Sequence, residues 1–467
     1  MTTMDFDIII IGSGPGGYVA AIRASQLGKK VAVIERAEVG GICLNWGCIP
    51  TKALLKSAQV YNYMKHSENY GVKVEGEILA DFQAMVERSR GVAANMSKGV
   101  QFLFKKHGIE LIKAEASLEE AHKVNLKFAD AESKSITADN IILATGARAR
   151  ELPNLKIDGK KIIGYRQAMT MEKQPESMVV VGSGAIGSEF AYFYHSIGTQ
   201  VTLVEYLPTI IPLEDEDASK NLARAFKKMK MKVKTSSAVT NVDVSGEKCV
   251  VTIESKKGVE TIEVDVVLSA VGVQTNLEGL GLDNIGIENK NGKIIVDDYN
   301  KTNIEGIYAI GDIVHGPALA HVASREGIIC VEKIAGHEVE AMNYNNIPAC
   351  TYTSPEVASV GLTEAQAIDQ GYELRIGKFP FKASGKATAG GNTEGFVKVV
   401  FDAKTDLWLG CSMVGDNVTE MISEAVVARR MNVKGMDIIN AVHPHPTMSE
   451  AVMEAVSAAY GEAIHII

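Results

Sequence analysis

The sequence has few cysteines, and they do not form a set with the spacing of metal ligands. Six occur in 467 residues, at positions 43, 48, 249, 330, 350 and 411. A chain of this length can bury a large core, so it does not need a disulfide for stability. A zinc site would need a second close pair or a histidine at ligand spacing. The pair Cys43 and Cys48 therefore favours redox chemistry over a metal site or a structural disulfide.

The sequence also lacks long apolar runs and long runs of one charge. No apolar stretch approaches the ~18 residues that span a bilayer, and 48 basic against 57 acidic residues give a net charge of −9. This balance does not support a nucleic-acid site. The start MTTMDFDIIII contains acidic residues and no basic residue, so we expect no secretory leader and a reducing compartment. We expect a soluble protein without membrane insertion in the cytoplasm, or in the mitochondrial matrix if this is a processed chain.

Two stretches of the chain repeat the same parts in the same order. Residues 7–35 and 178–205 each contain an apolar strand, the pattern G-x-G-x-x-G, a helix that ends near a glycine, and a second apolar strand ending in glutamate. The interval from first glycine to glutamate is 23 residues in both copies. One G-x-G-x-x-G is weak evidence, because close helix–strand packing also needs glycine. Two copies with flanking strands and acids predict two βαβ dinucleotide-binding folds.

The glycines of each copy have separate roles in such a fold. The first allows a tight turn, the second lets a pyrophosphate approach the backbone at the helix N-terminus, and the third lets the helix pack on the strand. Glu35 and Glu205 can accept hydrogen bonds from ribose hydroxyls, and an acid at 205 favours NAD over NADP. The glycines in these positions are Gly12, Gly14 and Gly17 in the first copy, and Gly182, Gly184 and Gly187 in the second.

The cysteine pair follows Glu35 by eight residues, in the stretch GGICLNWGCIPTK. Five residues of regular helix turn two side chains about 140° apart, so the pair needs a distorted helix start. Gly47 and Pro50 favour such a distortion. A helix N-terminus would also stabilise the thiolate of Cys48.

Several motifs together resemble those of the flavin-dependent disulfide oxidoreductases. GGICLNWGCIPTKALL resembles the family's redox signature, and HPHPTMSEA (443–451) is similar to the C-terminal signature of its dihydrolipoamide-oxidising members. ILATGA (142–147) and GIYAIGDIVHGPALAHVASREG (306–327) resemble its FAD-contacting segments. The likeness covers essentially the whole chain. It implies FAD and NAD as cofactors, no metal, and oxidation of protein-bound dihydrolipoamide with NAD⁺ as the acceptor.

The resemblance also assigns roles to individual residues. Cys43 would meet the substrate, Cys48 would face the flavin, and Lys52 would lie near the flavin ring, paired with Glu189. In the FAD site, Asp312 would bind the ribityl chain, Ala320 and His321 would lie near the ring, Ala116 would contact the adenine end, and the other contacts would be Gly12, Ser13, Gly14, Pro15, Gly16, Gly17, Glu35, Thr145 and Gly146. In the NAD site, Val239 would contact the adenine end, and the other contacts would be Gly182, Gly184, Ala185, Ile186, Gly187, Glu205 and Gly272.

His445 is the candidate base. It stands between two prolines and so precedes, rather than lies in, a helix expected over 448–463. Glu450 could hold one ring nitrogen and leave the other free, as in a Ser-His-Asp triad, whereas a lone surface histidine would need no function. The resemblance implies that His445 deprotonates the dithiol, whose thiolate attacks Cys43. We expect His443 to be structural.

The resemblance further implies a two-fold homodimer, in which one subunit supplies His445 and Glu450 to the cysteines of the other. A lipoyl domain of an acyltransferase, or a glycine-cleavage carrier protein, would bring the substrate. The family usually has Thr where Ile42 stands, a smaller aliphatic residue where Trp46 stands, and Arg and Pro in the region of VQTN after Gly272. The first two departures affect the surroundings of the cysteines.

Other functions stay open at this point. A glutathione-reductase-like enzyme would prefer NADPH, against which Glu205 argues, and a mercuric-reductase-like enzyme would have a cysteine pair in its C-terminal tail, where AAYGEAIHII has none. A non-catalytic dinucleotide-binding subunit is a third possibility. In each case the expected fold is α/β, with two Rossmann-like dinucleotide-binding domains and a C-terminal α+β dimerisation domain. We predict a FAD-binding domain over 1–150 and 276–345, a NAD-binding domain over 151–275 and an interface domain over 346–467.

Overall fold

The computed structural model describes residues 4–466, and the chain divides into two compact units. The first unit runs to Ala53 and also contains Val86–Arg150 and Val273–Tyr344. The second contains Leu54–Met85, Glu151–Gly272 and the chain from Asn345 onward. Two helices contribute residues to both units, α3 (Cys48–Lys65) and α4 (Phe82–Lys106). The four domain boundaries expected from the sequence stay a prediction.

A parallel sheet forms the centre of the first unit. Its strand order is β3-β2-β1-β6, and β19 pairs with the free side of β6. Five of the six residues of β1 are buried, as is typical of a central parallel strand with both faces covered. The strand bounds are β1 Phe6–Ile11, β2 Val31–Glu35, β3 Glu110–Lys113, β6 Lys134–Leu143 and β19 Ile307–Ala309.

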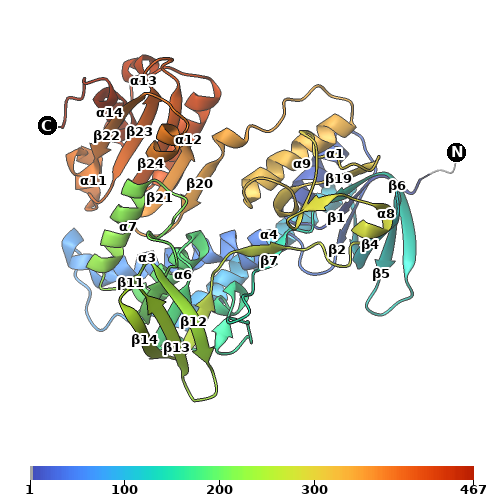
Figure 1. Cartoon of the computed structure of the whole chain (residues 1–467), viewed down its shortest axis with the longest axis horizontal. Helices are drawn as coiled ribbons and strands as arrows, with labels where there is room; N and C mark the ends of the chain where they lie inside the picture. The colour runs from blue at the N-terminus through green and yellow to red at the C-terminus, as the bar shows by residue number, and fades with distance from the viewer. Residues whose placement is uncertain (1–3, 467) are drawn as a thin grey trace. The chain divides into compact units, whose positions relative to one another are not determined.

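Two helices of this unit, α1 (Pro15–Gln26) and α9 (Ala320–Ile334), lie side by side (Figure 1). Their contact needs small residues, because a Cβ added at Gly327 would come within 2.8 Å of the Gly16 carbonyl oxygen. The close contact holds the start of α9 in the same unit as the first glycine-rich loop.

Shorter elements complete the first unit. The amino-terminal half of β6 pairs antiparallel with β5, and β5 with β4, so a meander continues from the parallel sheet. The bounds of these elements are α2 Gly41–Trp46, β4 Glu115–Glu120, β5 Lys123–Lys127, β7 Ala147–Ala149, β16 Val273–Thr275, α8 Leu282–Ile285, β17 Asn289–Lys290, β18 Lys293–Ile294 and the 3₁₀ helix η2 Gly311–Ile313.

The second unit contains a copy of this architecture. A parallel sheet has the order β11-β10-β9-β15-β8, and an antiparallel meander has the order β12-β13-β14. The element bounds are β8 Ile162–Ile163, α5 Tyr165–Ala168, β9 Ser177–Val181, α6 Ala185–Ser196, β10 Gln200–Val204, α7 Glu216–Lys228, β11 Lys232–Lys234, β12 Ser237–Asp243, β13 Cys249–Ser255, β14 Gly258–Val264 and β15 Val266–Ser269.

The C-terminal part of the second unit is a five-stranded antiparallel sheet of order β20-β21-β24-β23-β22, covered by helices. Lys398 of β23 is buried and pairs with Asp215, which caps α7. The bounds are β20 Pro348–Thr351, β21 Glu356–Gly361, α10 Glu364–Asp369, β22 Leu374–Pro380, α11 Gly385–Gly390, β23 Phe396–Asp402, β24 Trp408–Gly415, α12 Val418–Arg430, α13 Gly435–Asn440 and α14 Glu450–Ala459; the remaining 3₁₀ helices are η1 Ser67–Tyr70, η3 Tyr344–Asn346 and η4 Phe381–Ala383.

The predicted fold class is confirmed: two Rossmann-like parallel sheets and a C-terminal antiparallel domain are present. The helix expected over 448–463 is shorter than predicted. It runs from Glu450 to Ala459, because Gly461 takes a left-handed conformation with φ +74° just beyond it. Within residues 4–466, no helix is long and apolar enough to cross a membrane.

Candidate active site

The first glycine-rich loop connects β1 to α1. Gly12 has φ +106°, and an added Cβ there would overlap the carbonyl oxygen of Ala144. A Cβ at Gly17 would overlap the Gly12 carbonyl, so this residue lets α1 pack on the loop. A Cβ at Gly14 would meet no atom within 4 Å. The protein itself therefore leaves open space at Gly14, where a pyrophosphate must approach the backbone.

The second loop, between β9 and α6, repeats this geometry. Gly182 has φ +95°, a Cβ at Gly187 would overlap the Gly182 carbonyl, and a Cβ at Gly184 would meet nothing within 4 Å. No described side chain caps the first turn of α1 or of α6. Their backbone N–H groups are therefore available to an anion, and the residues of both loops fit a dinucleotide.

A matched pair of substitutions separates the two glycine roles. Gly187→Ala places a methyl group on a backbone carbonyl, and we expect it to lower the free energy of unfolding by ~1–3 kcal/mol or more. Gly184→Ala has room and an ordinary backbone conformation, so we expect wild-type thermal stability and at least ~10-fold weaker NADH binding. Thermal unfolding and NADH fluorescence titration measure the two effects. Wild-type NADH affinity in Gly184→Ala would contradict the proposed position of the pyrophosphate.

The two predicted glutamates make equivalent hydrogen bonds. Glu35 Oε2 accepts from Ser13 N (3.0 Å) and Ser13 Oγ (2.6 Å), and Glu35 Oε1 accepts from Ala37 N (2.8 Å). Glu205 Oε2 accepts from Ser183 N and Oγ (both 2.8 Å), and Oε1 accepts from Leu207 N (2.8 Å). A carboxylate can accept about four hydrogen bonds, and each of these accepts three. Each glutamate can therefore still accept a hydrogen bond from a ribose hydroxyl.

Sequence reasoning missed Ser183, although it named the equivalent Ser13. The repeat itself carried the signal, because GSG occurs at the same place in both copies. Each serine joins the glycine-rich loop to the acid that ends the second strand. The loop and the ribose-binding group are thereby held together in each copy.

The predicted FAD-contacting segments lie in the first unit. Thr145 and Gly146 follow β6, and Thr145 Oγ1 donates to the carbonyl of Asn276 (2.7 Å). Ala320 and His321 begin α9, and Asp312 lies in η2. Burial raises the pKa of Asp312.

The weaker candidates lie on the meanders and at a strand end. Ala116 lies on β4, and its counterpart Val239 lies on β12 of the second unit. Gly272 follows β15 with φ +106°.

Glu326 is a buried acid beside this segment that the sequence did not single out. Its Oε2 accepts from Gly311 N (2.6 Å), and its Oε1 accepts from Tyr344 Oη (2.7 Å). Burial raises the pKa of Glu326 to about 7, although both hydrogen bonds oppose the shift. Lys293 Nζ donates to the carbonyls of Asp312 (2.8 Å) and Val314 (2.7 Å). These contacts fix the backbone that carries Asp312.

The cysteines stand on either side of a break between two helices. Cys43 lies within α2, and Cys48 is the first residue of α3. Gly47 separates the helices with φ −144° and ψ −115°. The expected distortion is therefore a complete interruption of the helix, which leaves Cys48 at a new N-terminus, where the helix dipole favours a thiolate.

The two sulfurs are thiols that interact with one another. A hydrogen bond with Cys48, together with burial, raises the pKa of the Cys43 thiol. A proton on Cys43 is therefore favoured. Lys52 lies one turn into α3 in the first unit, whereas Glu189 is buried in the second, where its Oε1 accepts from Tyr352 N (3.0 Å). The pairing of Lys52 with Glu189 stays a prediction.

His445 and Glu450 form a hydrogen-bonded pair in the second unit. His445 Nδ1 lies 2.8 Å from Glu450 Oε1, and Glu450 Oε2 accepts from Thr447 N (2.8 Å). Partial burial opposes the shift, but the hydrogen bonds from Thr447 and His445 lower the pKa of Glu450, so it is a carboxylate at neutral pH. The His445 side chain is 77% exposed. Within the described chain, no hydrogen bond involves its Nε2, which is free to accept a proton.

His443 has a different environment. Its side chain is only 9% exposed, and its Nε2 lies 2.8 Å from Glu424 Oε1. Its Nδ1 lies 3.1 Å from the Ala441 carbonyl oxygen. Both ring nitrogens are occupied, so His443 cannot act as a base without losing a contact.

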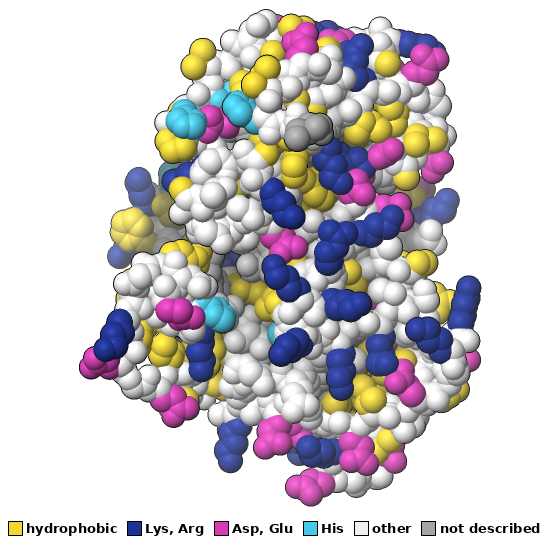
Figure 2. All heavy atoms as spheres, turned by 90° about the vertical axis from the view of Figure 1, so that its left-hand side faces the viewer, with side chains coloured by type: hydrophobic (Ala, Val, Ile, Leu, Met, Phe, Trp, Pro, Cys, Tyr) yellow, Lys and Arg dark blue, Asp and Glu magenta, His cyan; other side chains and the backbone are white. Residues whose placement is uncertain are grey.

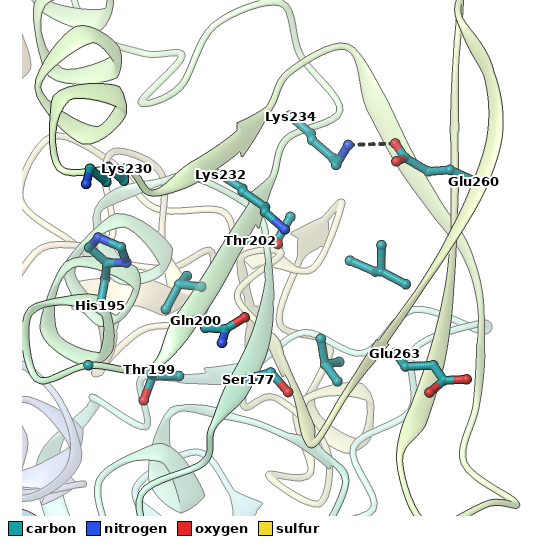
Figure 3. A pocket seen from close by; sticks show the side chains of 14 residues that line it. Ser177, His195, Thr199, Gln200, Thr202, Lys230, Lys232, Lys234, Glu260 and Glu263 are labelled. Carbon is teal, nitrogen blue, oxygen red and sulfur yellow. Dashed lines mark hydrogen bonds and ion pairs between the residues drawn. The ribbon is translucent and has the colours of Figure 1, made fainter.

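A hollow of about 520 Å³ in the second unit lies away from these groups. Figure 3 shows its lining, with an ion pair of 2.7 Å between Lys234 and Glu260. Ser177 and Gln200 begin their strands, so the hollow lies at the amino ends of the sheet, whereas dinucleotides bind at the carboxyl ends. The first unit has a similar hollow of about 550 Å³ at the amino ends of its sheet. Because both units have a hollow at this place, we attribute it to the repeated fold.

The lysines around the hollow have a structural explanation. Strand β11 is an edge strand, and exposed lysines on an edge prevent pairing with other chains. Figure 2 shows Lys and Arg side chains gathered on part of one face, with Asp and Glu among them. Across residues 4–466, no group of three or more His, Cys, Asp or Glu side chains could hold a metal ion.

Comparisons with known proteins agree with this geometry. Residues 6–327 match the family described as "Pyridine nucleotide-disulphide oxidoreductase", and residues 347–456 match the dimerisation domain of that family. The family implies a flavoprotein that binds FAD and NAD, and the dimerisation domain implies a homodimer.

Similar proteins cover nearly all of the chain. Dihydrolipoyl dehydrogenases of Rhizobium etli and Zymomonas mobilis are each 47% identical over 98% of this chain and 99% of their own length. The mitochondrial dihydrolipoyl dehydrogenase of Pisum sativum is 42% identical over 98% of this chain and 92% of its own length. The crystal structure of LpdA from Mycobacterium tuberculosis superposes with a TM-score of 0.90 at 27% identity, covering 96% of this chain and 98% of that one. The chain belongs to the pyridine nucleotide-disulphide oxidoreductase family.

Proposed function

We propose that this chain is a dihydrolipoyl dehydrogenase, an oxidoreductase that converts protein-bound dihydrolipoamide to lipoamide and reduces NAD⁺ to NADH. The observation that carries the proposal is the exposed His445, held by Glu450 with one ring nitrogen free. A base of this kind is needed to deprotonate a dithiol substrate before it attacks a disulfide. A non-catalytic dinucleotide-binding subunit would not need it.

The chemistry of the protein groups follows from their positions. His445 Nε2 takes a proton from one substrate thiol, and the resulting thiolate attacks Cys43 of the Cys43–Cys48 disulfide. The S–S bond breaks as the mixed disulfide forms, and Cys48 leaves as a thiolate at the N-terminus of α3. The second substrate thiol then loses its proton and attacks the substrate sulfur of the mixed disulfide. The bond between that sulfur and Cys43 breaks, cyclic lipoamide is released, and Cys43 takes up the proton of the second thiol.

The glycine-rich loops would hold the two cofactors, FAD with Glu35 in the first unit and NAD with Glu205 in the second. When bound, FAD accepts the two electrons of the dithiol and NAD⁺ removes them as hydride. Lys52, Asp312, Ala320 and His321 are the residues that we assign to the region of the flavin ring and its side chain.

The proposal includes the partners of the enzyme. We expect His445 and Glu450 of one subunit to serve the cysteines of the other in the homodimer. The dihydrolipoamide group would come from the lipoyl domain of an acyltransferase, or from a glycine-cleavage carrier protein. The cytoplasm or the mitochondrial matrix is the expected compartment, because the cysteine pair must be accessible to reduction.

One steady-state assay tests the function. Purified protein reconstituted with FAD is expected to reduce NAD⁺ in the presence of dihydrolipoamide, with formation of NADH read at 340 nm. Glutathione disulfide and Hg(II) with NADPH are the comparison substrates. Faster turnover of either comparison pair would contradict the proposal, as would an inactive protein that retains FAD.

Glu205 is expected to determine the choice of nicotinamide cofactor. Two like charges ~4 Å apart repel by roughly 4 kcal/mol at an effective dielectric constant of ~20, so kcat/KM should favour NAD⁺ over NADP⁺ by at least ~10²-fold. Glu205→Gln removes the charge and should narrow this preference about tenfold. Glu35→Gln is the matched control, because it makes the same change in the other repeat and should leave the preference unaltered. Equal use of NADP⁺ by the wild type would refute the role of Glu205.

A further inference from the structure

Helix α4 holds the cysteine-bearing segment through three consecutive side chains. Each donates a hydrogen bond to a backbone carbonyl of α2 or α3. The bonds are Arg88 Nη1 to Ala53 O (2.7 Å), Ser89 Oγ to Pro50 O (2.9 Å) and Arg90 Nη1 to Asn45 O (2.5 Å). All six residues belong to the first unit. The segment that must open and close a disulfide is thus fastened to a neighbouring 25-residue helix.

Arg90 contacts two residues that lie between the cysteines in the sequence, Asn45 and Trp46. Its guanidinium carbon is 4.0 Å from the centre of the Trp46 ring, and Trp46 is the last residue of α2. The bond to Asn45 O satisfies one of the carbonyls that a helix leaves open at its C-terminus. A cation is also favoured at that end by the helix dipole. A six-residue helix is not stable alone. The contacts with Arg90 therefore help to stabilise the C-terminal end of α2.

The joint between α2 and α3 has little freedom. A Cβ added at Gly47 would come within 3.1 Å of the Ile42 carbonyl oxygen and 3.3 Å of the Cys43 Cα. At the other end of α2, the buried Asn45 donates through Nδ2 to the carbonyls of Val39 (2.9 Å) and Gly41 (3.0 Å). The backbone between the two cysteines is therefore held at both ends of α2, and Arg90 contacts the two residues that directly precede Gly47.

We propose that Arg90 and Trp46 are a positioning pair that favours the dithiol form of Cys43 and Cys48 over the disulfide form. The inference rests on the proposed function, in which these cysteines are a redox pair. Reduction takes two electrons and one proton from the dithiol substrate, breaks the S–S bond, and leaves a thiol on Cys43 and a thiolate on Cys48.

The preference has a physical cause. The disulfide is neutral, whereas the reduced pair carries a negative charge. We therefore expect the permanent positive charge of Arg90, held beside Asn45 and Trp46, to stabilise the reduced form more than the disulfide form. The Trp46 ring holds the guanidinium there through a cation–π contact. Without the ring, the guanidinium keeps only its hydrogen bond to Asn45 O, and we expect the long Arg90 side chain to enter solvent more often, where its charge is screened.

The test is a redox titration of the two cysteines in the purified, FAD-loaded protein. Samples are equilibrated in buffers of reduced and oxidised dithiothreitol, and alkylation of Cys43 and Cys48 is measured by peptide mass spectrometry. Arg90→Gln and Trp46→Val should each lower the equilibrium constant for reduction about tenfold, which is about 30 mV for a two-electron couple. The double variant should show the same tenfold effect, because both substitutions remove one contact.

Two controls distinguish positioning from a general effect on the fold. Trp46→Phe keeps an aromatic face, so the reduction potential of the Cys43–Cys48 pair should stay close to that of the wild type. Arg88→Gln removes the same charge and a similar hydrogen bond from α4, but Arg88 is exposed and bonds to Ala53, so it should change the equilibrium constant less than about threefold. Unfolding temperature and FAD content show whether each variant is intact.

The possible outcomes separate this inference from the proposed function. A wild-type protein whose Cys43 and Cys48 never form a disulfide contradicts the function itself. A normal wild-type titration with unshifted Arg90→Gln and Trp46→Val contradicts only the positioning pair. An equal shift in Arg88→Gln also overturns it, because the effect would then come from the total charge of α4.

Discussion

Replacing His445 with Gln is expected to slow the reaction with dihydrolipoamide by ~10²–10⁴-fold, the usual cost of losing a general base. Gln keeps a polar side chain of similar size but cannot accept the proton. The loss should fall on the dithiol half-reaction alone. Reduction of an artificial electron acceptor by NADH should stay near normal, because it needs only the cofactor sites. Stopped-flow measurement of the two half-reactions tests the difference.

Two further substitutions act as controls for His445. Glu450→Gln should give a smaller loss of the same kind, because Glu450 orients the ring through the 2.8 Å bond instead of taking the proton. His443→Gln makes the same change two residues away, at a buried ring bonded to Glu424. It should lower thermal stability without a selective effect on the dithiol half-reaction. If His445→Gln slows both half-reactions equally, His445 supports the fold or the dimer instead.

The parts of the fold that sequence could predict are those encoded locally. The two βαβ units were recognisable because strand, glycines, helix and acid follow one another within 30 residues, and the structure places Glu35 and Glu205 in matching hydrogen bonds. Gly47 and Pro50 predict a distorted helix start, and the structure has a complete break between α2 and α3 at Gly47. The prediction of a helix to residue 463 is wrong at its C-terminal end, because Gly461 takes the left-handed conformation that ends a helix.

Contacts between distant parts of the chain could not be predicted in this way. Arg90 reaches Asn45 and Trp46 across 45 and 44 positions. Lys398 of β23 reaches Asp215 across 183 positions, and nothing near either residue indicates the other. Trp46 departs from the usual family residue, and only the structure shows that Arg90 lies over its ring. A contact with a residue on another helix cannot be read from the neighbours of Trp46 in the sequence.

Replacing Cys48 with Ser is expected to reduce dihydrolipoamide turnover at least ~10³-fold, because no disulfide can then form. We also expect the wild-type protein to be yellow and to develop a long-wavelength charge-transfer absorbance with one equivalent of dithiol, and Cys48→Ser should abolish this band. The band requires a thiolate next to oxidised flavin, and we assign that thiolate to Cys48 at the start of α3. In Cys48→Ser the burial of Cys43 still raises the pKa of its thiol, so we expect Cys43 not to replace this thiolate.

Cys43→Ser is the matched variant, and it should separate the two sulfurs. It also loses turnover, because Cys43 is the sulfur that the substrate attacks. Cys48 remains at the helix N-terminus in this variant, where the dipole stabilises its thiolate, so the band should be present even before dithiol is added. Absorbance spectra of the two variants, recorded at equal FAD content, decide the assignment. A band that persists in Cys48→Ser and is absent from Cys43→Ser would reverse the roles of the two cysteines, because the thiolate beside the flavin would then be Cys43.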